Sequence, residues 1–197
     1  MQAALDAGIE PVEVLIAGEN VEAALLAEVS TLGHPPRVIG VFRRSDLPRP
    51  AALPDVGLAL WHVGDPGNVG TLVRAADALG PAFVATSAGS ADPTGPKALR
   101  ASMGALFRVP LCGFDDAPGR RIALVARRGR PLDELAFSGP TTFVLGSERE
   151  GLPEEVLERC DERATIPLAT DADSLNVAVA GAIALYELSR RRRATTN

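Results

Sequence analysis

Four apolar runs, separated by segments with helical spacing, recur along the chain from residue 55 onward. The runs lie at residues 56–63, 82–86, 121–126 and 141–145. Near-continuous apolar runs of this length are typical of strands buried on both faces of a parallel sheet. Helical spacing predicts helices at residues 69–79, 97–103, 153–160 and 175–191. The alternation of strand and helix predicts an α/β fold built on a parallel sheet.

The first 47 residues predict a smaller unit. Strands are expected at residues 12–16 and 37–42 with a helix at 19–29 between them, which suggests a βαβ-like arrangement. A further helix is expected at residues 2–7. Nothing before it completes a layer, so we expect an N-terminal part to be missing.

A proline-rich segment follows this unit. Three prolines between residues 47 and 54 favour an extended connection. The predicted domains are therefore 1–47 and 55–197, joined by a linker at 48–54.

The last predicted helix has a polar entrance followed by small apolar residues. Ser174 and Asn176 are residue types that satisfy the free amides at a helix start. The alanines and the glycine between 178 and 184 let backbone or a ligand approach closely. An ordinary capped core helix would explain this stretch alone. Two upstream glycine-bearing turns, at residues 65–76 and 146–151, suggest instead that the three segments share one site.

Both upstream turns follow a predicted strand and lead into a helix. In the first, Asn68 is expected to cap the helix, and Gly67 and Gly70 let the backbone approach a ligand. The second enters its helix through Pro153, and a simple capped turn is the alternative interpretation. Neither turn carries the G-x-G-x-x-G fingerprint or a P-loop, which argues against a nucleotide-dependent dehydrogenase or a P-loop enzyme.

Composition narrows the functional classes. The formal net charge of −5 gives no support to nucleic-acid binding by itself, although arginines cluster at residues 43–44, 120–121, 127–130 and 190–193. Two cysteines without a CxxC motif, and no clustered histidines, predict neither a disulfide framework nor a metal site. No apolar stretch reaches the roughly 20 residues that span a bilayer. We expect a soluble, cytoplasmic protein without a membrane segment.

The three polar stretches together resemble the SpoU/TrmH family of RNA ribose 2'-O-methyltransferases, within the SPOUT superfamily. The family pattern N-x-G-x-x-x-R is similar to residues 68–74, G-x-E-x-x-G to residues 146–151, and S-L-N-V-x-V-A to residues 174–180. Residues 94–110 are similar to the middle segment of the family. The resemblance covers about residues 55–190. Residues 3–47 more loosely resemble a ribosomal-protein-L30e-like substrate-binding domain that lacks its beginning.

The resemblance implies a trefoil-knotted parallel sheet with helices on both faces, assembled as a homodimer. It implies S-adenosylmethionine as cofactor and structured RNA as substrate, with rRNA slightly preferred over tRNA. By matching position, the expected cofactor contacts are Leu145, Gly146, Ile166, Pro167, Leu168 and Leu175. The expected catalytic residue is Arg74, within a polar shell of Asn68, Glu148, Ser174 and Asn176.

The chemistry of Arg74 limits its role. A guanidinium is a poor base because its pKa lies above about 12. Arg74 is therefore expected to bind a substrate phosphate and to stabilise charge on the attacking oxygen, with Glu148 pairing to it and fixing its rotamer. Ala75 stands where the family often has Thr, Ser or Asn, which removes one hydrogen bond. A non-catalytic RNA-binding protein with the same fold, or a SPOUT enzyme that methylates a base, are the alternatives.

Overall fold

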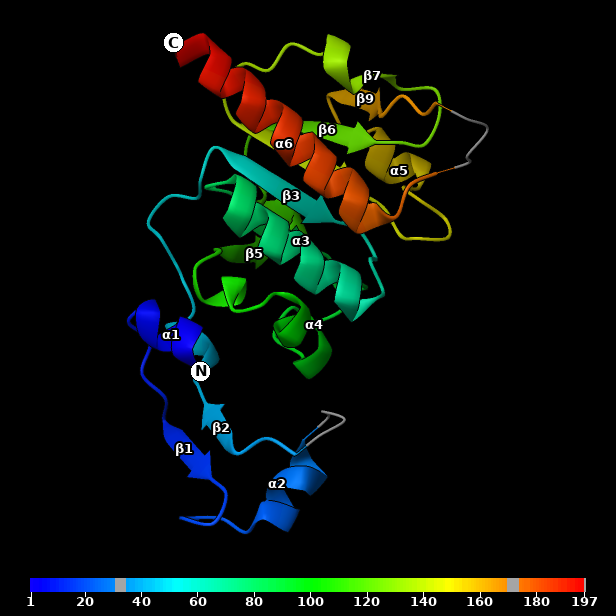
Figure 1. The fold of residues 1–197 in the computed structure, drawn as a ribbon. Coiled ribbons are helices and arrows are strands. Elements are labelled where there is room, and N and C mark those ends of the chain that lie inside the picture. The colour runs from blue at the N-terminus through cyan, green and yellow to red at the C-terminus, as the bar shows by residue number, and fades with distance from the viewer. Residues whose placement is uncertain (31–34, 170–173, 197) are drawn as a thin grey trace.

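The structure, a computed structural model, describes residues 1–30, 35–169 and 174–196. Helices and a large sheet form most of it (Figure 1). The helices are α1 (Gln2–Asp6), α2 (Ala23–Val29), α3 (Pro66–Leu79), α4 (Pro96–Ala101), α5 (Glu154–Leu157) and α6 (Val177–Thr196). The strands are β1 (Glu13–Ile16), β2 (Val38–Val41), β3 (Val56–Leu60), β4 (Phe83–Thr86), β5 (Leu111–Gly113), β6 (Arg120–Leu124), β7 (Arg130–Pro131), β8 (Thr141–Leu145) and β9 (Glu162–Thr165).

The large sheet has seven strands in the order β5-β4-β3-β8-β6-β9-β7. Every pairing within it is parallel, which confirms the predicted α/β class. The chain builds outward from β3 through β4 to β5 and then crosses to β6 on the other side of β8. Ligands of open parallel sheets bind at the carboxyl ends of the strands where the direction of winding reverses. That point here lies beside β3, β8 and β6.

The central strands are buried on both faces. All five residues of β3 and all five of β8 are buried. Leu58 and Phe143 lie in the core cluster that contains the buried side chains of α3 and α6, whereas Ala59 and Val144 lie in the cluster that contains Val156 of α5. The sheet is thus covered by α3 and α6 on one face and by α5 on the other (Figure 1).

Two glycines let α3 pack closely against its neighbours. A Cβ on Gly70 would lie 2.2 Å from the carbonyl oxygen of Ala98 in α4, and a Cβ on Gly181 of α6 would lie 2.4 Å from Cδ2 of Leu72. Such distances are too short for any side chain. The backbone of α3 is therefore held against α4 on one side and α6 on the other.

The N-terminal strands differ from the prediction. Strands β1 and β2 pair antiparallel, so the expected βαβ-like unit, which requires parallel strands, is wrong. The alternation of apolar residues identified both strands but carries no information on their relative direction.

Helix α1 packs against the 3-10 turn of residues 105–107 that follows α4. Ala4 and Ile9 form a small buried cluster with Phe107, and the ring of Phe42 lies 5.4 Å from that of Phe107. Arg44 pairs with Asp92 in the loop before α4. The division at 1–47, 48–54 and 55–197 stays a prediction.

The observed strands and helices differ in several places from those predicted by the apolar pattern of the sequence. Strands β5, β7 and β9 were not predicted, because β9 carries charged residues and the other two are only three and two residues long. Helix α3 begins at Pro66 rather than 69, and α6 extends to Thr196 rather than 191. Over the described residues, no helix combines the length and the apolar character needed to cross a membrane.

Candidate active site

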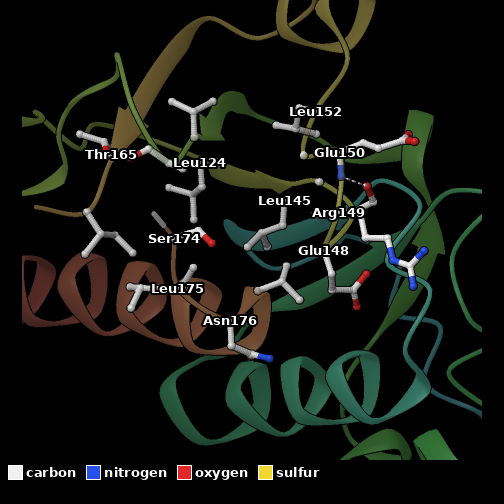
Figure 2. Close-up of a pocket in the computed structure, with 18 of the residues that line it drawn as sticks. Leu124, Leu145, Glu148, Arg149, Glu150, Leu152, Thr165, Ser174, Leu175 and Asn176 are labelled. Atoms are coloured by element: carbon white, nitrogen blue, oxygen red, sulfur yellow. Dashed lines mark hydrogen bonds between the residues drawn. The ribbon is translucent and has the colours of Figure 1, made fainter. Parts of the chain in front are cut away.

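A pocket of about 580 Å³ opens at the carboxyl edge of the parallel sheet (Figure 2). It lies between the ends of β6, β8 and β9 and the start of α6. Its lining residues are Leu124, Val125, Ala126, Leu145, Gly146, Ser147, Glu148, Arg149, Glu150, Gly151, Leu152, Thr165, Ile166, Leu168, Ser174, Leu175, Asn176, Val177 and Ala180. The leucines and Ile166 make one wall apolar, whereas the turn after β8 and the start of α6 supply polar groups.

Three polar side chains from distant segments form a continuous hydrogen-bonded chain beside this pocket. The amide nitrogen Nδ2 of Asn176 donates to Oδ1 of Asn68 at 3.0 Å. Nδ2 of Asn68 in turn donates to Oε1 of Glu148 at 2.8 Å. The three turns singled out from the sequence therefore meet at one place, as expected.

Asn176 also starts α6. Its Oδ1 accepts from the amides of Ala178 at 2.9 Å and Val179 at 3.3 Å, so it caps the helix as its residue type predicts. Ser174 lines the pocket two residues earlier. One side chain thus fixes both the start of α6 and the position of Asn68.

The start of α3 is capped by a different residue from the one expected. Oδ1 of Asp65 accepts from the amides of Gly67 at 2.5 Å and Asn68 at 3.3 Å, and Pro66 occupies the first helical turn. The hydrogen bond from Gly67 is the main cause that lowers the pKa of Asp65. The expected capping role of Asn68 is wrong, and its amide is left to join Glu148 and Asn176.

Glu148 is held by backbone as well as by Asn68. The amides of Gly64 and Asp65 each donate to its carboxylate at 3.3 Å. Partial burial raises the pKa of Glu148, but the hydrogen bonds from Asn68, from its own backbone and from these two amides outweigh it, so the net pKa is lowered. Glu148 is therefore an ionised anchor for the start of α3.

The loop after β4 supports the backbone that Glu148 binds. Oγ of Ser87 accepts from the amide of His62 at 2.9 Å, and Oγ of Ser90 accepts from the amide of Val63 at 3.2 Å. Ser90 also donates to the carbonyl oxygen of Leu60 at 3.0 Å. The turn from β3 into α3 is consequently held from two sides.

Arg74 lies on the exposed surface of α3. Among residues 1–30, 35–169 and 174–196 it has no hydrogen-bond or ion-pair partner. The expected pairing of Glu148 with Arg74 is wrong, because the Glu148 carboxylate is occupied by Asn68 and the turn before it. The Arg74 guanidinium is consequently available to a ligand.

The expected cofactor contacts gather largely at the pocket. Leu145, Gly146, Ile166, Leu168 and Leu175 line it, whereas Pro167 does not. Sequence reasoning missed the wall formed by residues 124–126 and the side chain of Arg149. The wall at 124–126 could have been expected, because these residues form the carboxyl end of the strand predicted at 121–126, where parallel sheets bind ligands.

The turn after β8 is a tight hairpin. Ser147 and Gly151 exchange backbone hydrogen bonds of 3.1 and 3.0 Å, and Oγ of Ser147 accepts from the amide of Glu150 at 3.1 Å. A Cβ on Gly146 would lie 2.1 Å from the carbonyl carbon of Gly151. Only glycine fits at residue 146, which explains why the pattern G-x-E-x-x-G begins with it.

A metal site finds no support in the part of the chain that the structure describes. No group of three or more His, Cys, Asp or Glu side chains there is placed to hold a metal ion. The two cysteines, Cys112 and Cys160, are free and half-buried. Burial raises the pKa of the Cys112 thiol to about 11.

Comparison with known proteins identifies relatives over most of the chain. An uncharacterised tRNA/rRNA methyltransferase of Synechocystis is 33% identical over 193 residues, covering 92% of this chain and 69% of the relative. The 23S rRNA (guanosine(2553)-2'-O)-methyltransferase RlmP of Bacillus subtilis is 38% identical over 140 residues, covering 66% of this chain and 56% of the relative. The chain spans about half the length of three mycobacterial relatives.

Solved structures agree in fold. The SpoU methyltransferase AviRb of Streptomyces viridochromogenes, in complex with the cofactor AdoMet, superimposes with a TM-score of 0.82 at 26% identity and covers 98% of this chain and 87% of that one. The profile of the SpoU rRNA Methylase family matches residues 55–186, which contain all three polar turns. The chain therefore belongs to the SpoU rRNA methylase family.

Proposed function

We propose that this protein transfers a methyl group from S-adenosylmethionine to a ribose 2'-hydroxyl of structured RNA, with rRNA as the preferred substrate. The observation that carries the proposal is the hydrogen-bonded chain of Asn68, Glu148 and Asn176 beside the pocket. The names of the relatives support it, because RlmP is a 2'-O-methyltransferase of 23S rRNA.

The pocket fits the cofactor. Its volume of about 580 Å³ lies within the range of about 300 to 1,000 Å³ usual for small-molecule sites. Leu124, Leu145 and Leu175 offer an apolar surface to a flat ring, and the backbone of the turns after β8 and β9 offers polar groups to its edges. Leu145, Gly146, Ile166, Pro167, Leu168 and Leu175 remain the proposed contacts. AviRb was solved with AdoMet bound, which supports the same cofactor here.

When bound, S-adenosylmethionine supplies a methyl group on a positively charged sulfur. The 2'-oxygen of the ribose forms a bond to this carbon as the carbon–sulfur bond breaks, and the hydroxyl proton leaves for solvent or a nearby acceptor. Such an in-line displacement depends chiefly on alignment of the reacting atoms. The protein's main task is therefore to hold the ribose in place.

Arg74 is the proposed catalytic residue. Its exposed guanidinium has no partner among the described residues, so its planar fork is free to bind a phosphate of the RNA. A phosphate held in this way fixes the ribose, and the positive charge stabilises negative charge developing on the 2'-oxygen. Glu148 is a poor candidate for the base, because its hydrogen bonds lower its pKa. Its proposed role is to fix Asn68 at the head of the helix that carries Arg74.

The assembly is proposed to be a homodimer with the trefoil knot of the SPOUT fold. Val179 and Tyr186 on α6 expose 46% and 51% of their surface, as an apolar contact with a second copy requires. The return of α6 to α3, where Asn176 reaches Asn68, is compatible with a knotted path. Residues 1–47 are proposed to help select the RNA. An enzyme acting on ribosomal or transfer RNA would work in the cytoplasm.

The test uses tritiated S-adenosylmethionine and unmodified RNA transcripts, followed by nucleoside analysis. The wild-type protein is expected to produce a labelled 2'-O-methylnucleoside. Arg74→Ala should abolish transfer while leaving calorimetric cofactor binding intact, and Arg74→Lys should be impaired because it lacks the planar fork. Arg159→Ala is the matched control, since Arg159 pairs with Asp115 beside α5.

Three results would count against the proposal. A labelled base would indicate a base methyltransferase. Cofactor binding without any label would favour the non-catalytic alternative, which the names of the relatives do not support. Transfer by Arg74→Ala at the wild-type rate under single-turnover conditions would remove Arg74 from the mechanism.

A further inference from the structure

At least eight of the sixteen basic side chains from residue 55 onward form ion pairs with acidic neighbours. The ion pairs are Lys97–Asp65, Arg108–Asp77, Arg120–Glu162, Arg130–Glu162, Arg159–Asp115, Arg163–Glu154, Arg190–Glu187 and Arg191–Glu187. A chain with a net charge of −5 has acidic groups to spare for such pairing. An arginine left without a partner is therefore informative.

Three arginines from residue 55 onward make no hydrogen bond or ion pair within the described part of the chain: Arg74, Arg128 and Arg149. All three are exposed. They lie in the segments that follow β3, β6 and β8, which are neighbours in the sheet order β3-β8-β6. Because parallel strands end at one edge, Arg128 and Arg149, in the turns after β6 and β8, belong to the same edge as the pocket, whereas Arg74 lies about two turns into α3.

Arg149 is the one of the three that lines the pocket itself. It lies in the hairpin closed by the hydrogen bonds between Ser147 and Gly151, so its backbone is held firmly. The flanking carboxylates do not neutralise it, since Glu148 is bound to Asn68 and to the turn before α3. The hairpin thus presents an unpaired cation between two acidic residues.

The direction of the Arg149 side chain indicates which ligand it meets. Figure 2 shows it extending from the hairpin away from Leu124 and Leu175, which belong to the apolar wall. The apolar wall suits the ring of the cofactor, which leaves the opposite side, where the Arg149 side chain lies, open to the RNA. A guanidinium binds a phosphate through two parallel hydrogen bonds, and RNA offers phosphates along its whole length.

We propose that Arg149 binds a backbone phosphate of the RNA next to the nucleotide that is methylated, as a second contact beside Arg74. This inference rests on the proposed function. The two arginines lie in segments that Asn68 and Glu148 join directly, so the distance between their backbones is fixed before RNA binds. Two fixed cations would set the direction of the RNA strand across the pocket.

The test compares Arg149→Ala, Arg149→Lys and Arg159→Ala, which serves as the matched loss of one exposed charge. Binding of an unmodified 23S rRNA transcript is measured over a series of salt concentrations, with methyl transfer and calorimetric cofactor binding in parallel. Arg149→Ala should weaken RNA binding about tenfold. The slope of log affinity against log salt should become shallower by about 0.7 to 0.9, the value of one phosphate contact. Arg149→Lys should retain most of the slope, and cofactor affinity should stay unchanged.

The outcomes separate the possible roles of Arg149. If Arg149→Ala matches Arg159→Ala in RNA affinity and salt slope, no phosphate contact exists and the inference is overturned. Weaker cofactor binding with unchanged RNA binding would instead assign Arg149 to the carboxylate of the cofactor. The binding measurement needs no turnover. A wild-type protein that binds RNA through Arg149 but transfers no methyl group would therefore contradict the proposed function, while the phosphate contact of Arg149 itself would stand.

Discussion

Asn176 connects two structural tasks that substitution can separate. Its Oδ1 accepts from the amides of Ala178 and Val179 at the start of α6, and its Nδ2 donates to Asn68. Asn176→Ala removes both contacts. Asn176→Asp keeps an acceptor of the same shape at the helix start, where a negative charge is favourable, but removes the donor to Asn68.

The magnitudes follow from the two contacts. Loss of the cap costs about 0.5 to 2 kcal/mol in free energy of unfolding. Loss of the hydrogen bond to Asn68 costs about 0.5 to 1.5 kcal/mol. Asn176→Ala should therefore destabilise by about 1 to 3.5 kcal/mol, which for a chain of this size lowers Tm by roughly 2 to 14 °C. Asn176→Asp should lose only the second part, about 0.5 to 1.5 kcal/mol, partly offset by the helix dipole.

The Tm of each variant is measured by circular dichroism during heating. The rate of methyl transfer to RNA is measured in parallel. Both should transfer methyl groups more slowly than the wild type, because each breaks the link between α6 and Asn68. The reasoning is refuted if Asn176→Asp melts as low as Asn176→Ala, since capping would then contribute nothing. It is also refuted if Asn176→Ala melts at the wild-type temperature.

Two further predictions concern packing and charge. Gly70→Ala should lower the free energy of unfolding by about 1 to 3 kcal/mol in denaturant titrations, because its Cβ would lie 2.2 Å from the carbonyl oxygen of Ala98. Gly64→Ala, which meets no atom within 4 Å, is the control, and equal stability of the two variants would contradict the close packing. Hydrogen bonds from two arginines of the following turn lower the pKa of Glu187 from 4.5 to about 2. Because the folded-state pKa is the lower one, this stabilisation is present above pH 4.5 and is lost as the pH falls towards 2. Glu187→Gln should therefore reduce stability at pH 7 and flatten its decline in acid, and an unchanged pH profile would disprove the pairing.

The central fold was predictable because burial leaves a strong signal in the sequence. Strands β3 and β8 are buried on both faces and read as unbroken apolar runs. Strand β9 was missed because the charged residues Glu162 and Arg163 interrupt its apolar pattern, although it pairs with both β6 and β7. The predicted parallel arrangement of β1 and β2 was wrong, because the alternation of apolar residues does not encode the relative direction of two strands.

The candidate site was predictable as a set of segments but not as a set of contacts. The three motifs meet as expected, yet Glu148 binds Asn68 rather than Arg74. Residue types indicate what a side chain is able to bind, whereas the partner depends on distances that only the folded chain defines. The capping of α3 by Asp65 could have been predicted from the sequence, because Asp65 followed by Pro66 is a common helix start.

The hydrogen bonds of Asn68 also bear on how the protein folds. They join Asn68 to Glu148, 80 positions further along the chain, and to Asn176, 108 positions further along. Closing loops of this length is entropically costly, and folds rich in such distant contacts form slowly. During synthesis the ribosome must release Asn176 before the chain of hydrogen bonds is complete. All strands of the sheet precede Asn176 in the chain, so the segments of the candidate site are the last parts of the fold to be joined.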